Sequence, residues 1–215
     1  MQYGLHMSVS INSEQITRDV IVIGGSAGGF SAVIEILSGL PPDLPAIIGV
    51  VIHRGAASTS DWSVSLGMKT KLRVVEPTDR SPLARGVVYI APADCHMTFE
   101  RDHIALARGA KEHYTRPAVD PLFTSAALAY GPRVVGVVLT GGGHDGMQGL
   151  LDITSAGGLS LVQQPTEAPD ASMPEYAIAH DHVRAALTVD RIGAALVVLA
   201  RGGTVPIGVT EEPRT

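Results

Sequence analysis

Residues 19–29 have the sequence DVIVIGGSAGG, in which an apolar, β-branched run meets four glycines and one serine. A short continuous run of this kind is typical of a strand buried on both faces of a sheet. Beyond the glycines, apolar residues recur at positions 30, 33, 34 and 37, which is the spacing of one helix face. The stretch therefore predicts a strand, a tight turn and a helix, the first unit of a parallel α/β sheet.

The same alternation of apolar runs and helical patterns continues along the chain. Further strands are expected at residues 46–52, 87–90, 134–139 and 159–162, and helices at 120–130, around Leu150 and at 190–200. Residues 97–100 and 103–106 fit a hairpin that turns at Arg101-Asp102. The predicted fold is α/β: a three-layer sandwich with a mostly parallel, Rossmann-like sheet and an antiparallel hairpin excursion.

Length and composition favour one globular domain. The chain has 215 residues, of which 45% are hydrophobic and 17% charged, and this balance excludes an intrinsically disordered protein. The ends of the chain are polar and aperiodic. We expect a flexible leader at residues 1–16, a single domain at 17–201 and a flexible tail at 202–215.

Charge and cysteine content restrict the partners and the compartment. A formal net charge of −5 argues against nucleic acid or an anionic membrane as partner. One local basic cluster, Lys69, Lys71 and Arg73, fits a solvated strand edge or loop. The only cysteine, Cys95, allows no internal disulfide, and the chain has neither a secretory signal pattern nor a long apolar run. We therefore expect a cytoplasmic protein without membrane insertion.

Three polar residues, Ser26, His53 and Asp145, closely follow the carboxyl ends of separate predicted strands. These ends share one edge of an open parallel sheet, where ligands usually bind, so the three side chains can converge. Ser26 fits the pattern G-x-S-x-G between a strand and a helix, where a sharp turn exposes the hydroxyl as a nucleophile. His53 can then act as base, and Asp145 can orient the imidazole.

Each of the three residues also has a purely structural interpretation. Ser26 can cap the following helix, His53 can be a polar residue at a strand end, and Asp145 can close an Asx turn or cap a helix. Dinucleotide binding would require glycine at position 26 and an acidic residue near position 53, and the chain has neither. The eight histidines show no H-E-x-x-H spacing, so no metal site is expected.

Several motifs, taken in order, resemble the catalytic domain of the chemotaxis protein-glutamate methylesterases, the CheB family. They are Gly24-Gly25-Ser26-Ala27-Gly28-Gly29, the strand ending in His53, YIAPADCHM at 89–97, RPAVDPLF at 116–123, LTGGGHDG at 139–146, and Met173-Pro174. The motifs occur in the family's order and extend over residues 19–200, nearly the whole predicted domain.

The resemblance implies a serine hydrolase with nucleophile Ser26, base His53 and orienting acid Asp145. It implies removal of methyl groups from glutamyl methyl esters on the cytoplasmic helices of methylated chemoreceptors and, as in many members, deamidation of receptor glutamines. Backbone N–H groups near Ala27 and in the turn 141–143 would form the oxyanion hole. Neither a metal nor an organic cofactor is implied.

The chain departs from the family pattern around the implied site. Ala27 stands where threonine is common, Gly142 where methionine is common, and Arg54 follows the histidine in place of methionine. These changes bear on substrate choice more than on reaction type. The family's phospho-receiver domain is missing from this sequence, so we expect an enzyme that is constitutively open or controlled by a separate regulatory protein.

Two alternatives to a methylesterase stay open at this point. One is a low-turnover module that binds receptors or an adaptor. The other is a related esterase or amidase that acts on another substrate.

Overall fold

The structure is a computed structural model that describes residues 16–58, 60–181 and 183–205. Its main sheet has the strand order β3-β4-β2-β1-β7-β8-β9, and every neighbouring pair is parallel. The strands are Val20–Gly25 (β1), Ile47–Ile52 (β2), Arg73–Val75 (β3), Val87–Ile90 (β4), Val134–Val138 (β7), Leu159–Gln163 (β8) and Ala185–Leu187 (β9). A separate antiparallel hairpin pairs His96–Phe99 (β5) with Ile104–Ala107 (β6).

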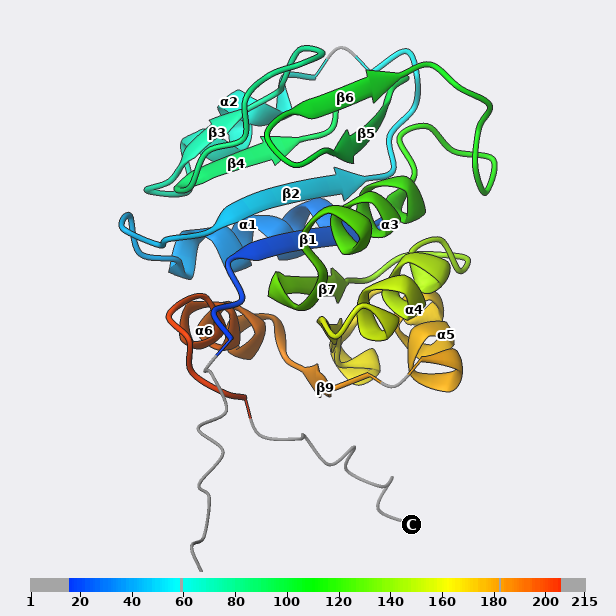
Figure 1. Cartoon of the computed structure of the whole chain (residues 1–215). Helices are drawn as coiled ribbons and strands as arrows, with labels where there is room; N and C mark the ends of the chain where they lie inside the picture. Colours follow the sequence, from blue (N-terminus) through cyan, green and yellow to red (C-terminus); the bar gives the residue numbers. More distant parts are fainter. Residues whose placement is uncertain (1–15, 59, 182, 206–215) are drawn as a thin grey trace, which may run out of the picture.

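Helices cover both faces of the sheet (Figure 1). They are Gly29–Gly39 (α1), Trp62–Gly67 (α2), Val119–Tyr130 (α3), Met147–Ser155 (α4), Ser172–His180 (α5) and Val189–Ala200 (α6), with 3₁₀ turns at Gly131–Arg133 and Pro165–Glu167. One apolar core packs α1 and α6 against the sheet, and the other packs α3, α4, α5 and the hairpin against the opposite face. The predicted three-layer α/β architecture with its hairpin is confirmed.

Strand β1 lies at the centre of the sheet because its side chains serve both cores. Ile21 and Ile23 belong to one core, whereas Val20 and Val22 belong to the other. This alternation explains why the run has no polar position. The register pairs Gly25 with Ile52, so the residues that follow these two strands begin side by side at the carboxyl edge.

The structure contains short elements that the sequence pattern did not predict. Strands β3 and β9 have three residues each, which is too short for a recognisable period. Helices α2 and α5 also lacked a clear amphipathic signal. Arg73 begins the edge strand β3 and is exposed, as the solvated interpretation of the basic cluster predicts.

The predicted domain edges remain predictions. Residues 1–15 and 206–215, which include most of the expected leader and tail, lie outside the described residues. The described chain continues to Val205, whose side chain packs into the α1–α6 core. None of the helices within 16–58, 60–181 and 183–205 combines the length and apolarity that a membrane crossing requires.

The close packing of α3 on β1 is possible because Gly24 has no side chain. A Cβ placed there would lie 2.2 Å from Cγ1 of Val119, the first residue of α3. The helix start can therefore rest directly on the strand only because position 24 is glycine.

We predict that Gly24→Ala lowers the free energy of unfolding by about 1–3 kcal/mol, because the new methyl group forces the helix start away from the strand. Urea unfolding measures the change. Gly39→Ala is the control, since a Cβ at the end of α1 meets nothing within 4 Å. Equal urea midpoints for the two variants would contradict this packing argument.

Candidate active site

Three strand ends are joined by backbone hydrogen bonds at the carboxyl edge of the sheet. The N–H of His53, after β2, donates to the carbonyl of Gly25 at 3.0 Å. The N–H of Ser26, after β1, donates to the carbonyl of Thr140, just beyond β7, at 2.9 Å. The three segments that carry Ser26, His53 and Asp145 therefore lie together, as their positions after the strands predict.

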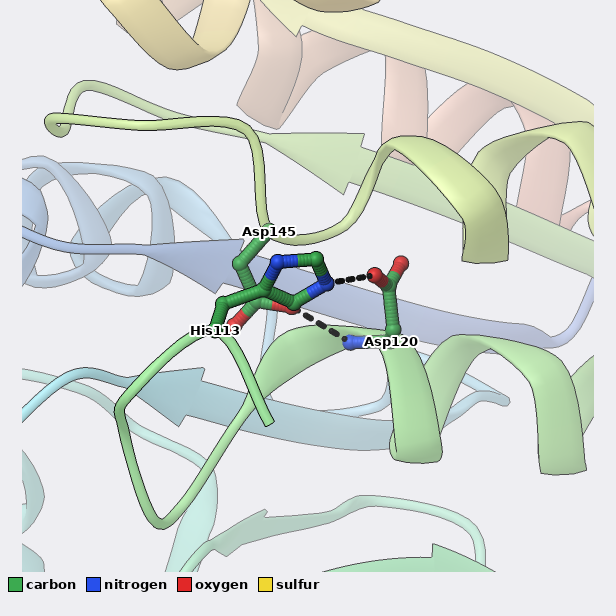
Figure 2. A group of neighbouring side chains, drawn as sticks. All are labelled: His113, Asp120 and Asp145. Atoms are coloured by element: carbon green, nitrogen blue, oxygen red, sulfur yellow. Dashed lines mark hydrogen bonds and ion pairs between the residues drawn. The ribbon is translucent and has the colours of Figure 1, made fainter. Parts of the chain in front are cut away.

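Asp145 is buried against the beginning of α3, although the two are far apart in the sequence (Figure 2). Its Oδ2 accepts the N–H of Val119 at 2.7 Å, and its Oδ1 accepts the N–H of Asp120 at 3.0 Å. The N-cap residue of α3, Ala118, offers no capping side chain. Asp145 thus satisfies N–H groups that the helix leaves unpaired, and its charge is favoured by the helix dipole.

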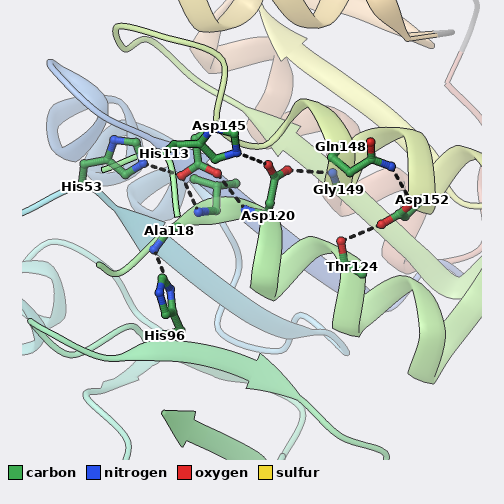
Figure 3. Close-up of polar contacts among 11 residues, drawn as sticks. His53, His96, His113, Ala118, Asp120, Thr124, Asp145, Gln148, Gly149 and Asp152 are labelled. Carbon is green, nitrogen blue, oxygen red and sulfur yellow. Dashed lines mark hydrogen bonds and ion pairs between the residues drawn. The ribbon is translucent and has the colours of Figure 1, made fainter. Parts of the chain in front are cut away.

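His53 completes the surroundings of Asp145 (Figure 3). Its Nε2 lies 2.6 Å from Oδ2 of Asp145, and the two side chains are 17% and 1% exposed. Nδ1 is consequently the ring nitrogen left to exchange a proton with a substrate or nucleophile. Asp145 thus caps a helix and also contacts the imidazole; this contact is the one that the orienting role requires, and the role itself stays a prediction.

The charge state of Asp145 follows from these contacts. Burial acts to raise the pKa of its carboxyl, but hydrogen bonds from His53, Val119 and Asp120 outweigh burial and hold the pKa below its ordinary value. The carboxyl is therefore ionised at neutral pH, which is the state that stabilises a protonated imidazole beside it.

A second carboxyl, that of Asp120, lies beside that of Asp145, on the side away from His53 (Figure 3). Its Oδ1 accepts the N–H of Gly149 in α4 at 2.7 Å, and its Oδ2 lies 2.9 Å from Nε2 of His113. Burial raises the pKa of Asp120, helped by the neighbouring negative charge of Asp145 and opposed by the bonds to Gly149 and His113. Asp145, just before α4, thus binds the start of α3, while Asp120, in α3, binds the start of α4.

His113, Asp120 and Asp145 are also the one group in the described ranges that could hold a metal ion, with possible ligand atoms within 4.8 Å of one another. The donor set fits an ion poorly. Both oxygens of Asp145 already accept N–H groups, and Asp120 accepts from Gly149 and contacts His113. Hydrogen bonds account for the cluster, and we assign it no metal; the predicted independence from cofactors stays a prediction.

Ser26 lies half-buried in the turn between β1 and α1. It does not cap α1, because the N-cap is Gly28 (φ 79°) and no side chain caps that helix. The turn after β7 packs directly against it: a Cβ at Gly141 would lie 2.5 Å from the Cβ of Ser26 and 2.4 Å from Sδ of Met173. In the described part of the chain, no hydrogen bond joins the Ser26 hydroxyl to His53.

The backbone donors around Ser26 are only partly available to a ligand. The N–H of Gly141 donates to the carbonyl of Asp170 at 2.9 Å, and that of Ser26 is bonded to Thr140, so neither is free to bind an oxyanion. The N–H groups of Ala27, Gly142 and Gly143 have no backbone acceptor within the described ranges. Of the N–H groups expected to bind the oxyanion, those of Ala27, Gly142 and Gly143 therefore stay available.

Two supporting residues, Asp120 and His113, were not identified as part of the site from the sequence. The motif at 116–123 contains Asp120, but an acidic residue in the first turn of a helix is common and signals no special role. Nothing in the spacing of His113 points to Asp120. Only the docking of α3 on α4 brings Asp120, and with it His113, close to Asp145.

The fold and site define an α/β protein in which the half-buried imidazole of His53 contacts the buried carboxylate of Asp145 at the carboxyl edge of the parallel sheet. A family model described as CheB methylesterase matches residues 21–196, and the chain belongs to this family. The solved CheB methylesterase catalytic domain of Thermotoga maritima is similar, with a TM-score of 0.81 and 30% identity over 85% of this chain and 98% of that one.

Curated relatives agree with the family assignment. A protein of Anaeromyxobacter dehalogenans, named protein-glutamate methylesterase/protein-glutamine glutaminase 2, is 40% identical over 85% of this chain and 54% of its own length. A relative from Leptospira interrogans is 36% identical over 84% of this chain and 94% of its own length. The chain thus spans almost all of one relative and about half of the other.

We predict that Asp145→Asn destabilises the fold at neutral pH by about 1–3 kcal/mol, because the start of α3 and the ring of His53 lose a shared charged acceptor. The folded pKa of Asp145 lies below its ordinary value of about 3.9, so its stabilisation is present above that pH and is lost as pH falls toward the folded pKa. The difference from wild type should therefore shrink in acid.

Urea unfolding at pH 7 and near pH 3 tests this prediction. Asp43→Asn is the control, since the Asp43 side chain is 75% exposed and pairs only with Arg201 within the described contacts. An Asp145→Asn protein as stable as wild type at pH 7, or a difference that grows in acid, would show that this carboxylate does not hold the helix start.

Proposed function

We propose that the chain is a protein-glutamate methylesterase that hydrolyses glutamyl methyl esters of chemoreceptors, with Ser26 as nucleophile, His53 as base and Asp145 as orienting acid. The observation that carries the proposal is the bond from His53 Nε2 to the buried Asp145, formed where β2 ends beside the Ser26 turn. The names of the curated relatives support the substrate class and a second, glutaminase activity.

Acylation begins when Oγ of Ser26 attacks the ester carbonyl carbon. Because Nε2 of His53 is engaged by Asp145, Nδ1 is the nitrogen that takes the hydroxyl proton once the two side chains come into contact. Catalytic hydrogen bonds are often long in the free enzyme and shorten when substrate binds. The ionised Asp145 stabilises the imidazolium that forms.

Collapse of the tetrahedral intermediate breaks the bond to the methoxy group, which leaves as methanol with the proton from His53. Water then attacks the acyl-enzyme while Nδ1 takes a proton, and the glutamate carboxylate is released with regeneration of Ser26. A glutamine side chain follows the same route, with ammonia in place of methanol. The N–H groups of Ala27, Gly142 and Gly143 are the proposed donors to the oxyanion.

The compartment and the control of the enzyme are part of the same proposal. We place it in the cytoplasm, where the receptor helices are available as substrates and its single cysteine stays reduced. The enzyme is proposed to be either constitutively open or controlled by a separate regulatory protein. A low-turnover binding module would keep the fold without an activated hydroxyl, and labelling of Ser26 by a serine-directed phosphonate distinguishes the two.

We predict that Ser26→Ala reduces methanol release from methylated receptor membranes by at least about 1,000-fold, since the attacking oxygen is lost while the backbone of the turn is kept. His53→Ala should cause a comparable loss, and the double variant should be little worse than either, because the groups act as a unit.

Ser38→Ala is the matched control, since Ser38 is exposed at the end of α1 and, among the described residues, its hydroxyl donates only to the Glu35 carbonyl. It should keep wild-type turnover. Near wild-type methanol release by a folded Ser26→Ala protein would exclude Ser26 as nucleophile, and full additivity of the two losses would argue against a joint role.

A further inference from the structure

A cavity of about 310 Å³ opens beside His53, between the segment after β2 and the loop that joins β6 to α3. Its wall includes His53 and three cationic residues, Arg54, Lys111 and Arg116, and it contains no acidic residue. Gly55 and Ala56 complete much of the wall on the β2 side and leave the space open. We call this cavity the cationic pocket.

We propose that the cationic pocket binds a carboxylate of the substrate that flanks the glutamyl ester, so that the enzyme prefers esters within acidic segments. This inference rests on the proposed function and adds a substrate preference to it. Ser26 is not part of the pocket wall. An ester carbonyl at Ser26 and a carboxylate in the pocket therefore come from two different side chains of one substrate.

The charges in the wall favour an anion. Arg54 pairs with Glu76 at 3.0 Å, and Arg116 donates through Nε to Asp94 at 3.0 Å, so acids outside the wall balance these two cations. Lys111 is exposed and forms no close ion pair in the described part of the chain, although it lies near enough to Asp94 to help lower the pKa of that carboxyl. Lys111 is therefore the cation of the wall without a close acidic partner among the described residues, and a carboxylate from the substrate would pair with it.

Arg54 is a rigid part of this wall rather than a mobile surface side chain. Its side chain is 3% exposed, its Nη2 donates to the carbonyl of Ala91 at 2.8 Å, and its guanidinium lies 4.9 Å from the ring centre of Trp62. Its buried Nε has no acceptor among the described residues. The ion pair with Glu76, the bond to Ala91 and the stacking on Trp62 hold the guanidinium in place, so its positive charge is a fixed feature of the wall next to His53.

The loop that carries Lys111 is held in place against the site. Glu112 and Thr115 exchange backbone hydrogen bonds across a two-residue turn, in which His113 (φ 49°) and Tyr114 (φ 63°) both adopt the left-handed conformation. Non-glycine residues take this conformation only at a cost, which other contacts must offset. The bond from His113 to Asp120 provides such a contact, and it fixes the loop to the same helix that Asp145 caps.

The experiment uses pairs of helical peptides with one glutamyl methyl ester and either glutamate or glutamine at a flanking position, one pair for each position up to four residues away. At low salt we expect wild type to prefer the glutamate peptide of at least one pair by about fivefold in kcat/KM, mainly through KM. Lys111→Gln should lower that ratio toward one. Added salt should lower it in wild type.

Lys71→Gln is the matched control. Lys71 is exposed just before β3, at the amino ends of the strands, whereas the pocket lies at their carboxyl ends. It should keep the wild-type ratio. A wild-type enzyme that hydrolyses both members of every pair equally well would overturn the pocket proposal while leaving the methylesterase intact. The same conclusion follows if Lys111→Gln and Lys71→Gln change the ratio alike.

A binding measurement separates failure of the pocket from failure of the proposed function. Fluorescence anisotropy of the labelled peptides with the Ser26→Ala protein should show tighter binding of the glutamate peptide, and Lys111→Gln in that background should remove the difference. Equal binding of both peptides to the Ser26→Ala protein would overturn the pocket. Peptides that bind as expected but are never hydrolysed by wild type would refute the esterase and keep the pocket.

Discussion

The carboxylate of Asp145 is the group on which the rest of the site depends. A buried carboxylate without partners would cost several kcal/mol, so its place in the fold requires the donors that surround it. Two of them are backbone N–H groups at the start of α3, and the third is the ring of His53. The orientation of the imidazole is therefore tied to the docking of a helix, and that docking in turn requires glycine at position 24.

The reciprocal bond from Asp120 to Gly149 extends the same arrangement to α4. Asp145, from the turn before α4, binds N–H groups of α3, and Asp120, from α3, binds an N–H group of α4. The two helices and this turn therefore cannot shift independently of one another. His113 connects this arrangement to the loop of the cationic pocket. The proposed reaction centre and the proposed specificity pocket thus share one rigid support, in which the exposed Lys111 is the part able to adjust to a substrate.

The sequence predicted the parts of this structure that depend on local pattern. Unbroken apolar runs identified the central strands, and the polar residues directly after them pointed to one edge of the sheet, where Ser26, His53 and Asp145 are indeed found. Partners that come from distant segments left no such signal. That Asp145 would cap α3, with Val119 26 residues earlier in the chain, cannot be inferred from spacing. Arg54 is visible in the sequence as a departure from the family pattern, but its place in a pocket wall depends on the loop around Lys111, which the sequence pattern does not position.

The central claim is that Asp145 holds His53 so that its Nδ1 serves the hydroxyl of Ser26. A crystal structure of the protein after reaction with a serine-directed phosphonate tests it most directly. We expect phosphorus bonded to Oγ of Ser26, Nδ1 of His53 within hydrogen-bond distance of an adduct oxygen, and Nε2 still bonded to Asp145. An unlabelled Ser26, or an adduct with the ring of His53 turned away from it, would contradict the account.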